Sequence, residues 1–191
     1  MRSTAGWLRP RWLVIGLLLG LAFGLAWLYG FPRPASMAPP LGLVSEPAGS
    51  IAAGKSAPVF ALQTAAGDEI ELEALRGQVV LLNFWATWCA PCRLEMPDLE
   101  TRYRQRAAGD WEILAVNYDE PGDEVAAFGQ ELGLTFPLLL DPGGRVQALY
   151  RVRGYPTSVF VDRQGQIQIV HIGIMTSTQL DRYLAEMGIE L

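Results

Sequence analysis

The only two cysteines of this 191-residue chain are Cys89 and Cys92, in the run Cys-Ala-Pro-Cys. A disulfide between them would close a very small loop, worth about 2 kcal/mol of stability against about 5 for a loop that spans a domain. Two sulfurs at this spacing therefore suit reversible oxidation better than they suit stabilising a fold. A zinc site would need a second cysteine or histidine pair, and the lone His171 is expected to be a packing or capping residue.

The residues around the cysteines predict a strand followed by a helix. Residues 79–85 form an apolar run that ends just before Cys89, and helix-forming residues follow Cys92. Cys89 would then lie at a helix N-terminus, whose partial positive charge favours a thiolate and lowers a cysteine pKa below its usual value of about 8.5. Pro91 suits the first turn of this helix. Cys92, inside the helix, is expected to be the less exposed thiol.

These residues and two further stretches resemble the thioredoxin superfamily, and within it the membrane-anchored TlpA/ResA-like thiol-disulfide oxidoreductases. The matching stretches are residues 57–62, residues 75–92 and Gly154-Tyr155-Pro156-Thr157. The resemblance covers roughly residues 51–191. It implies a thioredoxin-like α/β fold, in which helices flank a central mixed sheet, with an N-terminal hairpin and a central insertion near residues 119–141.

The resemblance also assigns the catalytic residues. Cys89 is the attacking thiolate, Cys92 the resolving thiol, and Glu95 matches a family glutamate three residues beyond the second cysteine. Positions i and i+3 share a helix face, and a partly buried carboxyl beside a thiolate would have a raised pKa and could relay a proton. A solvated glutamate paired with an arginine is the alternative. Asn83 replaces the buried aspartate of cytosolic thioredoxins and cannot handle protons.

Tyr155, Pro156 and Thr157 are implied to form a substrate-facing loop. In this family the proline is cis and faces the active site, and the backbone of the preceding residue pairs with an extended client segment. An ordinary turn proline is the alternative. Trp88 is assigned to the same substrate-binding surface, whereas Trp85 is expected to pack in the core.

Periodicity and chain-breaking residues predict the order of the elements. The expected strands are residues 59–62, 69–72, 79–85, 111–117, 138–140, 157–161 and 166–172, and the expected helices are residues 90–107, 123–132, 144–150 and 176–187. Pro97 is expected to kink the helix that starts at Ala90. The strand-helix-strand order implies parallel neighbours in the sheet.

A second informative segment lies near the N-terminus, where residues 12–31 contain no charge. A helix of this length spans about 30 Å, the thickness of the hydrocarbon core of a bilayer. Arg2, Arg9 and Arg11 precede the segment, so the positive-inside rule puts the N-terminus in the cytoplasm and the cysteines on the extracytoplasmic, periplasmic side. A cleaved signal peptide is the alternative.

The chain is thus expected to contain a cytoplasmic tail (residues 1–11), a transmembrane signal anchor (12–31), a Pro/Ala-rich tether (32–50) and a thioredoxin-like domain (51–191). The first 35 residues hold four of the 15 basic residues and none of the 20 acidic ones, so the remainder has a net charge of −9. Such a surface argues against nucleic acid as a ligand.

These observations predict a single-pass, extracytoplasmic protein thiol-disulfide oxidoreductase with no cofactor and no metal. The resemblance favours reduction of protein disulfides, with apocytochrome c as a leading client and a transmembrane relay of the CcdA or DsbD type as the electron source. A copper or haem-assembly chaperone that uses the cysteines as ligands, and a dithiol oxidant, are the alternatives. Peroxide reduction is not expected, because Ala86 stands where a peroxidatic cysteine would have its threonine.

Overall fold

The computed structural model describes residues 51–106 and 109–189. A five-stranded mixed sheet lies at its centre, in the strand order β5-β4-β3-β6-β7, and a separate two-stranded hairpin pairs β1 with β2. The strands are β1 (Ala61–Gln63), β2 (Glu69–Glu71), β3 (Val79–Trp85), β4 (Trp111–Tyr118), β5 (Leu138–Asp141), β6 (Thr157–Val161) and β7 (Ile167–Ile172). β3, β4 and β5 are parallel, whereas β6 runs antiparallel to both β3 and β7.

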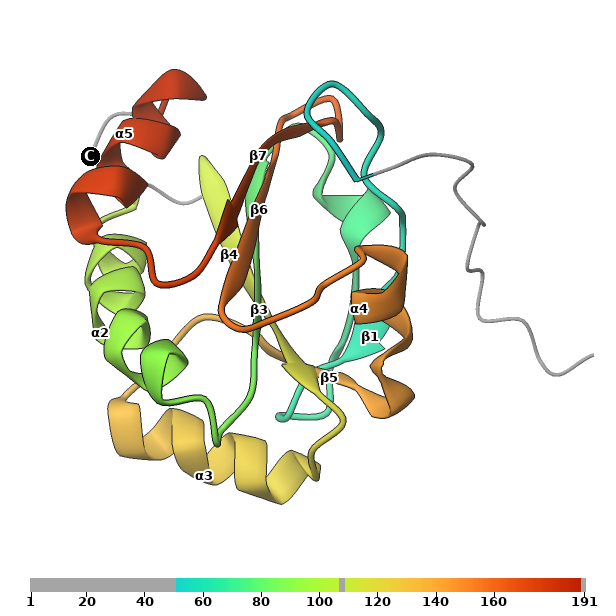
Figure 1. The fold of residues 1–191 in the computed structure, drawn as a ribbon, viewed down its shortest axis with the longest axis vertical. Coiled ribbons are helices and arrows are strands. Elements are labelled where there is room, and N and C mark those ends of the chain that lie inside the picture. The colour runs from blue at the N-terminus through green and yellow to red at the C-terminus, as the bar shows by residue number, and fades with distance from the viewer. Residues whose placement is uncertain (1–50, 107–108, 190–191) are drawn as a thin grey trace, which may run out of the picture. The chain divides into compact units, whose positions relative to one another are not determined.

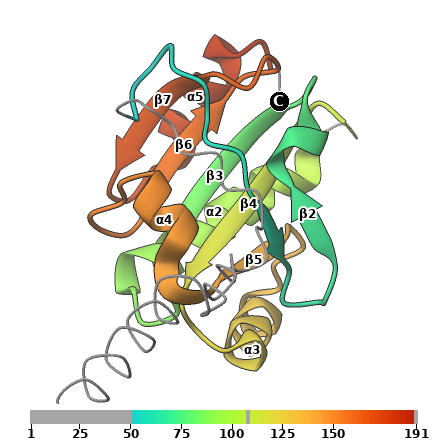
Figure 2. The ribbon, with the colours of Figure 1, turned by 90° about the vertical axis from the view of Figure 1, so that its right-hand side faces the viewer.

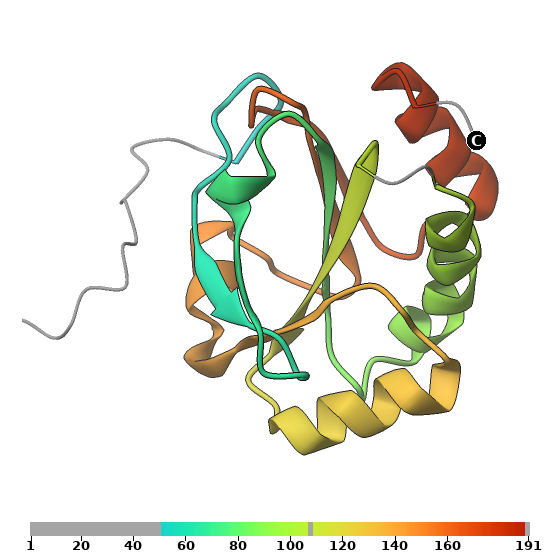
Figure 3. The same ribbon diagram turned by 180° about the vertical axis from the view of Figure 1, so that it is seen from behind.

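Helices cover both faces of this sheet (Figure 1). The helices are α2 (Ala90–Gln105), α3 (Gly122–Leu132), α4 (Arg145–Leu149) and α5 (Ser177–Glu186), with two 3-10 turns, η1 (Leu72–Leu75) and η2 (Pro142–Gly144). α2 and α5 lie on one face, as the view from behind also shows (Figure 3). α4 and the β1–β2 hairpin lie on the other face (Figure 2).

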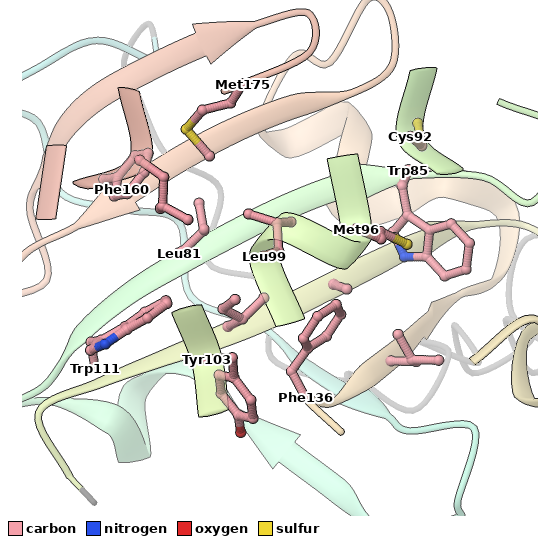
Figure 4. Close-up of a cluster of buried hydrophobic side chains, with 14 of the residues drawn as sticks. Leu81, Trp85, Cys92, Met96, Leu99, Tyr103, Trp111, Phe136, Phe160 and Met175 are labelled. Atoms are coloured by element: carbon pink, nitrogen blue, oxygen red, sulfur yellow. The ribbon is translucent and has the colours of Figure 1, made fainter. Parts of the chain in front are cut away.

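β3 is the strand on which both halves of the core depend, because all seven of its residues are buried. Successive side chains of a strand point to opposite faces. Leu81 and Trp85 accordingly pack into the cluster beneath α2 and α5 (Figure 4), while Leu82 and Phe84 pack into the cluster on the α4 side. A strand covered on both faces has an almost continuous apolar sequence, which is why β3 could be recognised from composition.

The expected elements are confirmed in kind and order, with differences at some ends. The helix expected over residues 144–150 is shorter, because Gly143 and Gly144 have φ values of 73° and 62°, outside the helical region, and α4 begins only at Arg145. The strand expected over residues 69–72 ends at Glu71, because Leu72 begins η1. Pro97 lies inside α2 as expected.

The predicted tail, anchor and tether, residues 1–50, lie outside the described residues, so these assignments stay predictions. Within residues 51–106 and 109–189, no helix combines the length and the apolar character needed to cross a membrane. His171, in β7, has its two ring nitrogens 3.2 Å from the Tyr183 hydroxyl and from the Ile174 carbonyl. These contacts agree with a packing role.

Candidate active site

The two cysteines lie after the end of β3, at the start of α2. Cys89 is the N-cap residue of α2, with an extended backbone (φ −81°, ψ 100°), and its sulfur accepts a hydrogen bond of 3.2 Å from the Cys92 N–H. Pro91 lies in the first turn of α2, where backbone N–H groups have no partner within the helix. Its missing N–H therefore costs no helical hydrogen bond. Cys89 and Cys92 form a disulfide with an S–S distance of 2.05 Å. The structure therefore describes the oxidised form, with the predicted N-terminal position of Cys89 confirmed.

The two sulfurs differ in their surroundings. Cys89 is 5% exposed and Cys92 is 1% exposed, in the order expected. Cys92 belongs to the cluster beneath α2, together with Trp85 and Met96 (Figure 4). Trp85 is fully buried and its ring lies 4.6 Å from that of Phe128, so its assignment to the core is confirmed.

Glu95 is buried one turn further along α2, with 2% of its surface exposed. Its Oε1 accepts a hydrogen bond of 2.9 Å from the Asn83 side-chain amide, and its Oε2 accepts one of 2.9 Å from the Met175 backbone N–H. In the part of the chain that the structure describes, no arginine or lysine pairs with this carboxyl. The alternative of a solvated glutamate paired with an arginine is therefore wrong.

Burial is the main influence on this carboxyl. It raises the pKa of Glu95 from the ordinary 4.5 to about 7, with a smaller contribution from the negative charge of Asp98. The hydrogen bonds from Met175 and Asn83 act in the opposite direction, because they favour the ionised form, but they do not cancel the effect of burial. Near neutral pH the Glu95 carboxyl is therefore able either to accept or to give a proton.

Asn83 has a role that sequence reasoning missed. It lies on the same face of β3 as Leu81 and Trp85, and its amide donates both to Glu95 and to the Ser158 hydroxyl, at 3.1 Å. Asparagine cannot carry the proton here, but its amide holds the group that can. A buried polar residue in the middle of an apolar strand was the available signal, because such a residue needs a partner.

The loop before β6 contains the predicted cis-proline. The Tyr155–Pro156 peptide bond is cis, as the resemblance implies, and Pro156 is buried with its carbonyl accepting from the Gly173 N–H at 2.9 Å. Thr157 is 5% exposed, and its hydroxyl donates to the Gly154 carbonyl at 2.8 Å. The side chain of Thr157 thus braces its own loop instead of facing outward.

Two aromatic side chains join this loop to the cysteine loop. The Trp88 side chain is 66% exposed, and its ring meets that of Tyr155 edge-on, with 5.6 Å between the centroids. The Tyr155 hydroxyl donates to Oε1 of Gln147. Burial raises the pKa of Tyr155 to about 12, so its hydroxyl keeps the proton that it donates. The predicted substrate-binding residues Trp88 and Tyr155 are thus brought together beside Pro156.

Glu120 is a further residue that sequence reasoning missed. Its carboxylate accepts hydrogen bonds from the Thr87 backbone N–H at 2.8 Å, from the Thr87 hydroxyl, and from the Asn117 side-chain amide at 2.6 Å. It thereby ties the turn before Cys89 to the end of β4. The parallel pairing of β3 with β4 brings these segments together at one edge of the sheet. Polar residues placed just after two parallel strands were the available signal.

Comparison with known proteins agrees with this geometry. The model of the AhpC/TSA family matches residues 53–170. The chain is 41% identical over 134 residues to the thioredoxin-like protein YneN of Bacillus subtilis, an alignment that covers 69% of this chain and 78% of YneN. It is 39% identical over 135 residues to the thiol-disulfide oxidoreductase ResA of Geobacillus kaustophilus, covering 71% of this chain and 78% of ResA.

Solved structures show the same fold. A Chlorobium tepidum protein assigned as the thiol:disulfide interchange protein DsbE matches with a TM-score of 0.67 and 32% identity, over 72% of this chain and 98% of its own. StoA from Bacillus subtilis matches with a TM-score of 0.59 and 31% identity, over 66% and 96%. The chain therefore belongs to the AhpC/TSA family of thioredoxin-like proteins and is a thiol-disulfide oxidoreductase of the ResA/DsbE type.

Proposed function

We propose that this protein reduces disulfides of extracytoplasmic client proteins, with apocytochrome c before haem attachment as the leading client, from a membrane anchor at its N-terminus. The observation that carries the exchange mechanism is the buried Glu95 carboxyl on the same helix as Cys92. A proton acceptor with a pKa of about 7 at that place suits the step in which the second thiol must lose its proton.

The first step is attack by the Cys89 thiolate on one sulfur of the client disulfide. A bond forms between Cys89 and that sulfur, the client S–S bond breaks, and the other client sulfur leaves as a thiolate that takes a proton. The position of Cys89 at the N-terminus of α2 favours the attacking thiolate. The hydrogen bonds from Thr87 to Glu120 fix the turn from which Cys89 attacks.

The second step releases the client. Cys92 gives its proton to the Glu95 carboxylate and attacks the Cys89 sulfur, so that the Cys89–Cys92 disulfide forms and the second client sulfur leaves as a thiolate. Two electrons have then passed from the protein to the client, whose two thiolates take one proton from solvent and one from Glu95. The product on the protein side is the disulfide that the structure describes.

Each cycle consumes two electrons that must be restored from outside the domain. The proposed source is a transmembrane reductant relay of the CcdA or DsbD type, which would carry electrons from the cytoplasm. The uncharged segment of residues 12–31, with Arg2, Arg9 and Arg11 before it, supports a signal anchor that keeps the domain on the periplasmic side. The tether of residues 32–50 would let the active site reach both this relay and its clients.

Trapping the mixed disulfide tests the proposal. In a Cys92→Ser variant the first step proceeds and the second cannot, so disulfide-linked adducts between Cys89 and client proteins should accumulate. Non-reducing gels of the full chain with an oxidised CxxC client peptide, followed by mass spectrometry of the junction, measure them. Cys89→Ser is the matched control and should trap nothing. Stoichiometric copper binding without adducts would instead favour the chaperone alternative.

The role of Glu95 predicts a pH dependence. With Glu95 the rate of the second step should rise as the pH increases through about 7, because the carboxylate is the form that accepts the Cys92 proton. In Glu95→Gln that inflection should vanish and the rate should fall by about 100-fold or more. Stopped-flow fluorescence of single turnovers between pH 5 and pH 9 gives both quantities. Asp98→Asn, one turn along α2, should keep the inflection at a slightly lower pH.

Stability of the oxidised protein gives a readout that does not depend on turnover. Because burial raises the pKa of Glu95, the folded state holds the proton more tightly than the unfolded chain. The stabilisation from this group is full below pH 4.5 and is lost as the pH rises through about 7. The free energy of unfolding, measured by urea unfolding at a series of pH values, should lose this pH-dependent slope in Glu95→Gln. An unchanged slope would show that another group titrates there.

The contacts of Glu120 predict that it positions the reactive turn. In Glu120→Gln a neutral amide replaces the carboxylate, which weakens the charge-assisted hydrogen bonds from Thr87 and Asn117, so the attack of Cys89 should slow by a factor between about 3 and 100. Thr87→Val should produce a similar loss, and the double variant should lose less than the two combined. Asp123→Asn, an exposed acid in the first turn of α3, is the matched control. Effects that are simply additive would contradict the coupling.

A further inference from the structure

A row of three aromatic side chains leads away from the disulfide. From Trp88 to Tyr155 the centroids are 5.6 Å apart, and from Tyr155 to Tyr118, at the end of β4, they are 6.0 Å apart. Trp88 and Tyr118 are 66% and 40% exposed. This aromatic row, Trp88-Tyr155-Tyr118, begins at the residue before Cys89 and extends the predicted substrate-binding residues Trp88 and Tyr155 to Tyr118.

The aromatic row borders a hollow of about 480 Å³. Its lining includes Tyr118, Tyr155, Gly144, Gln147 and Arg153. The Tyr118 ring packs directly on the backbone of Gly144. A Cβ atom at Gly144 would lie only 2.4 Å from the ring, so this contact needs glycine. Gln147 is 3% exposed and accepts from Tyr155, while its Nε2 has no hydrogen-bond partner among the described residues.

One segment that contributes to this hollow is positively charged, and Arg153 is the arginine of that segment in the lining. Between Asp141 and Asp162 the chain has three arginines, Arg145, Arg151 and Arg153, and no acidic residue. All three are exposed. Within residues 51–106 and 109–189 none of them forms an ion pair, whereas six of the other seven arginines there pair with a carboxylate.

The acidic groups next to the hollow are already engaged. The Asp119 carboxylate accepts from the Gly143 N–H at 2.7 Å. Asp141 is 1% exposed and accepts from the N–H groups of Val146 and Gln147 at 3.1 and 3.0 Å. The arginine segment is therefore a positively charged stretch, beside the charges that Asp119 and Asp141 keep, on a chain whose residues beyond the first 35 carry a net charge of −9.

We propose that the aromatic row and the arginine segment together bind an extended client segment that carries carboxylates a few residues from its disulfide. This inference rests on the proposed reduction of protein disulfides and names the class of client. The two centroid steps together span at most the rise of about three to four residues of extended chain, so the client carboxylates are placed within a few residues of the attacked cysteine. Aromatic rings bind extended backbone without regard to sequence, and guanidinium groups select carboxylates.

Matched peptides test this selection. Each contains one intramolecular disulfide, and they differ only at positions three to five residues from either cysteine, which hold glutamate, glutamine or lysine. The full chain, in a mild non-ionic detergent and kept reduced, should reduce the glutamate peptide with a kcat/KM about tenfold above that of the lysine peptide at low salt, and the ratio should shrink as salt is added.

Charge reversal identifies the surface responsible. The variant Arg151→Glu with Arg153→Glu should invert the preference, and the milder Arg151→Gln with Arg153→Gln should abolish it. Arg182→Glu, on α5 at the other face of the sheet, makes the same change of charge per site and should leave the preference as it is.

The outcomes distinguish failure of the client-binding surface from failure of the reductase function. Equal reduction of all three peptides, or a preference that survives reversal of Arg151 and Arg153, would overturn the client-binding surface while the reductase function stands. Failure to reduce any of the peptides would overturn the reductase function, and the client-binding surface with it.

Discussion

The burial of one carboxyl group behind the disulfide constrains much of this site. Glu95 is enclosed by β3, α2 and the segment before α5, and its oxygens are bound by the Asn83 amide and the Met175 N–H. An ionised carboxylate is expensive to bury without a cation, so the group retains its proton up to about pH 7. A proton is thus stored on the helix that carries Cys92, and three separate segments must meet to keep it there.

Two loops near Cys89 are held by hydrogen bonds and meet through aromatic side chains. Glu120 fixes the turn before Cys89 through Thr87, and the Gly173 N–H fixes the loop of the cis-proline. The exposed ring of Trp88 bridges these two loops by its contact with Tyr155. Cys89 therefore follows a turn that is held by hydrogen bonds and lies next in sequence to an exposed aromatic ring.

Much of this could be predicted from the sequence, because the information was local. The bounds of β3, the N-terminal position of Cys89 on α2 and the buried Trp85 follow from apolar runs and helix signals. Glu120 could not be placed in this way, because it meets Thr87 only through the parallel pairing of β3 and β4. The Met175 N–H carries no side-chain signal, and the inward turn of Thr157 depends on the fold of its own loop.

The direction of electron flow is the central claim, and the reduction potential of the Cys89–Cys92 pair tests it most directly. The full chain would be equilibrated in glutathione and dithiothreitol buffers and followed by tryptophan fluorescence. A protein that reduces client disulfides should have a potential near or below about −270 mV, the value of thioredoxin. A potential near about −120 mV, as in the oxidant DsbA, would contradict the account.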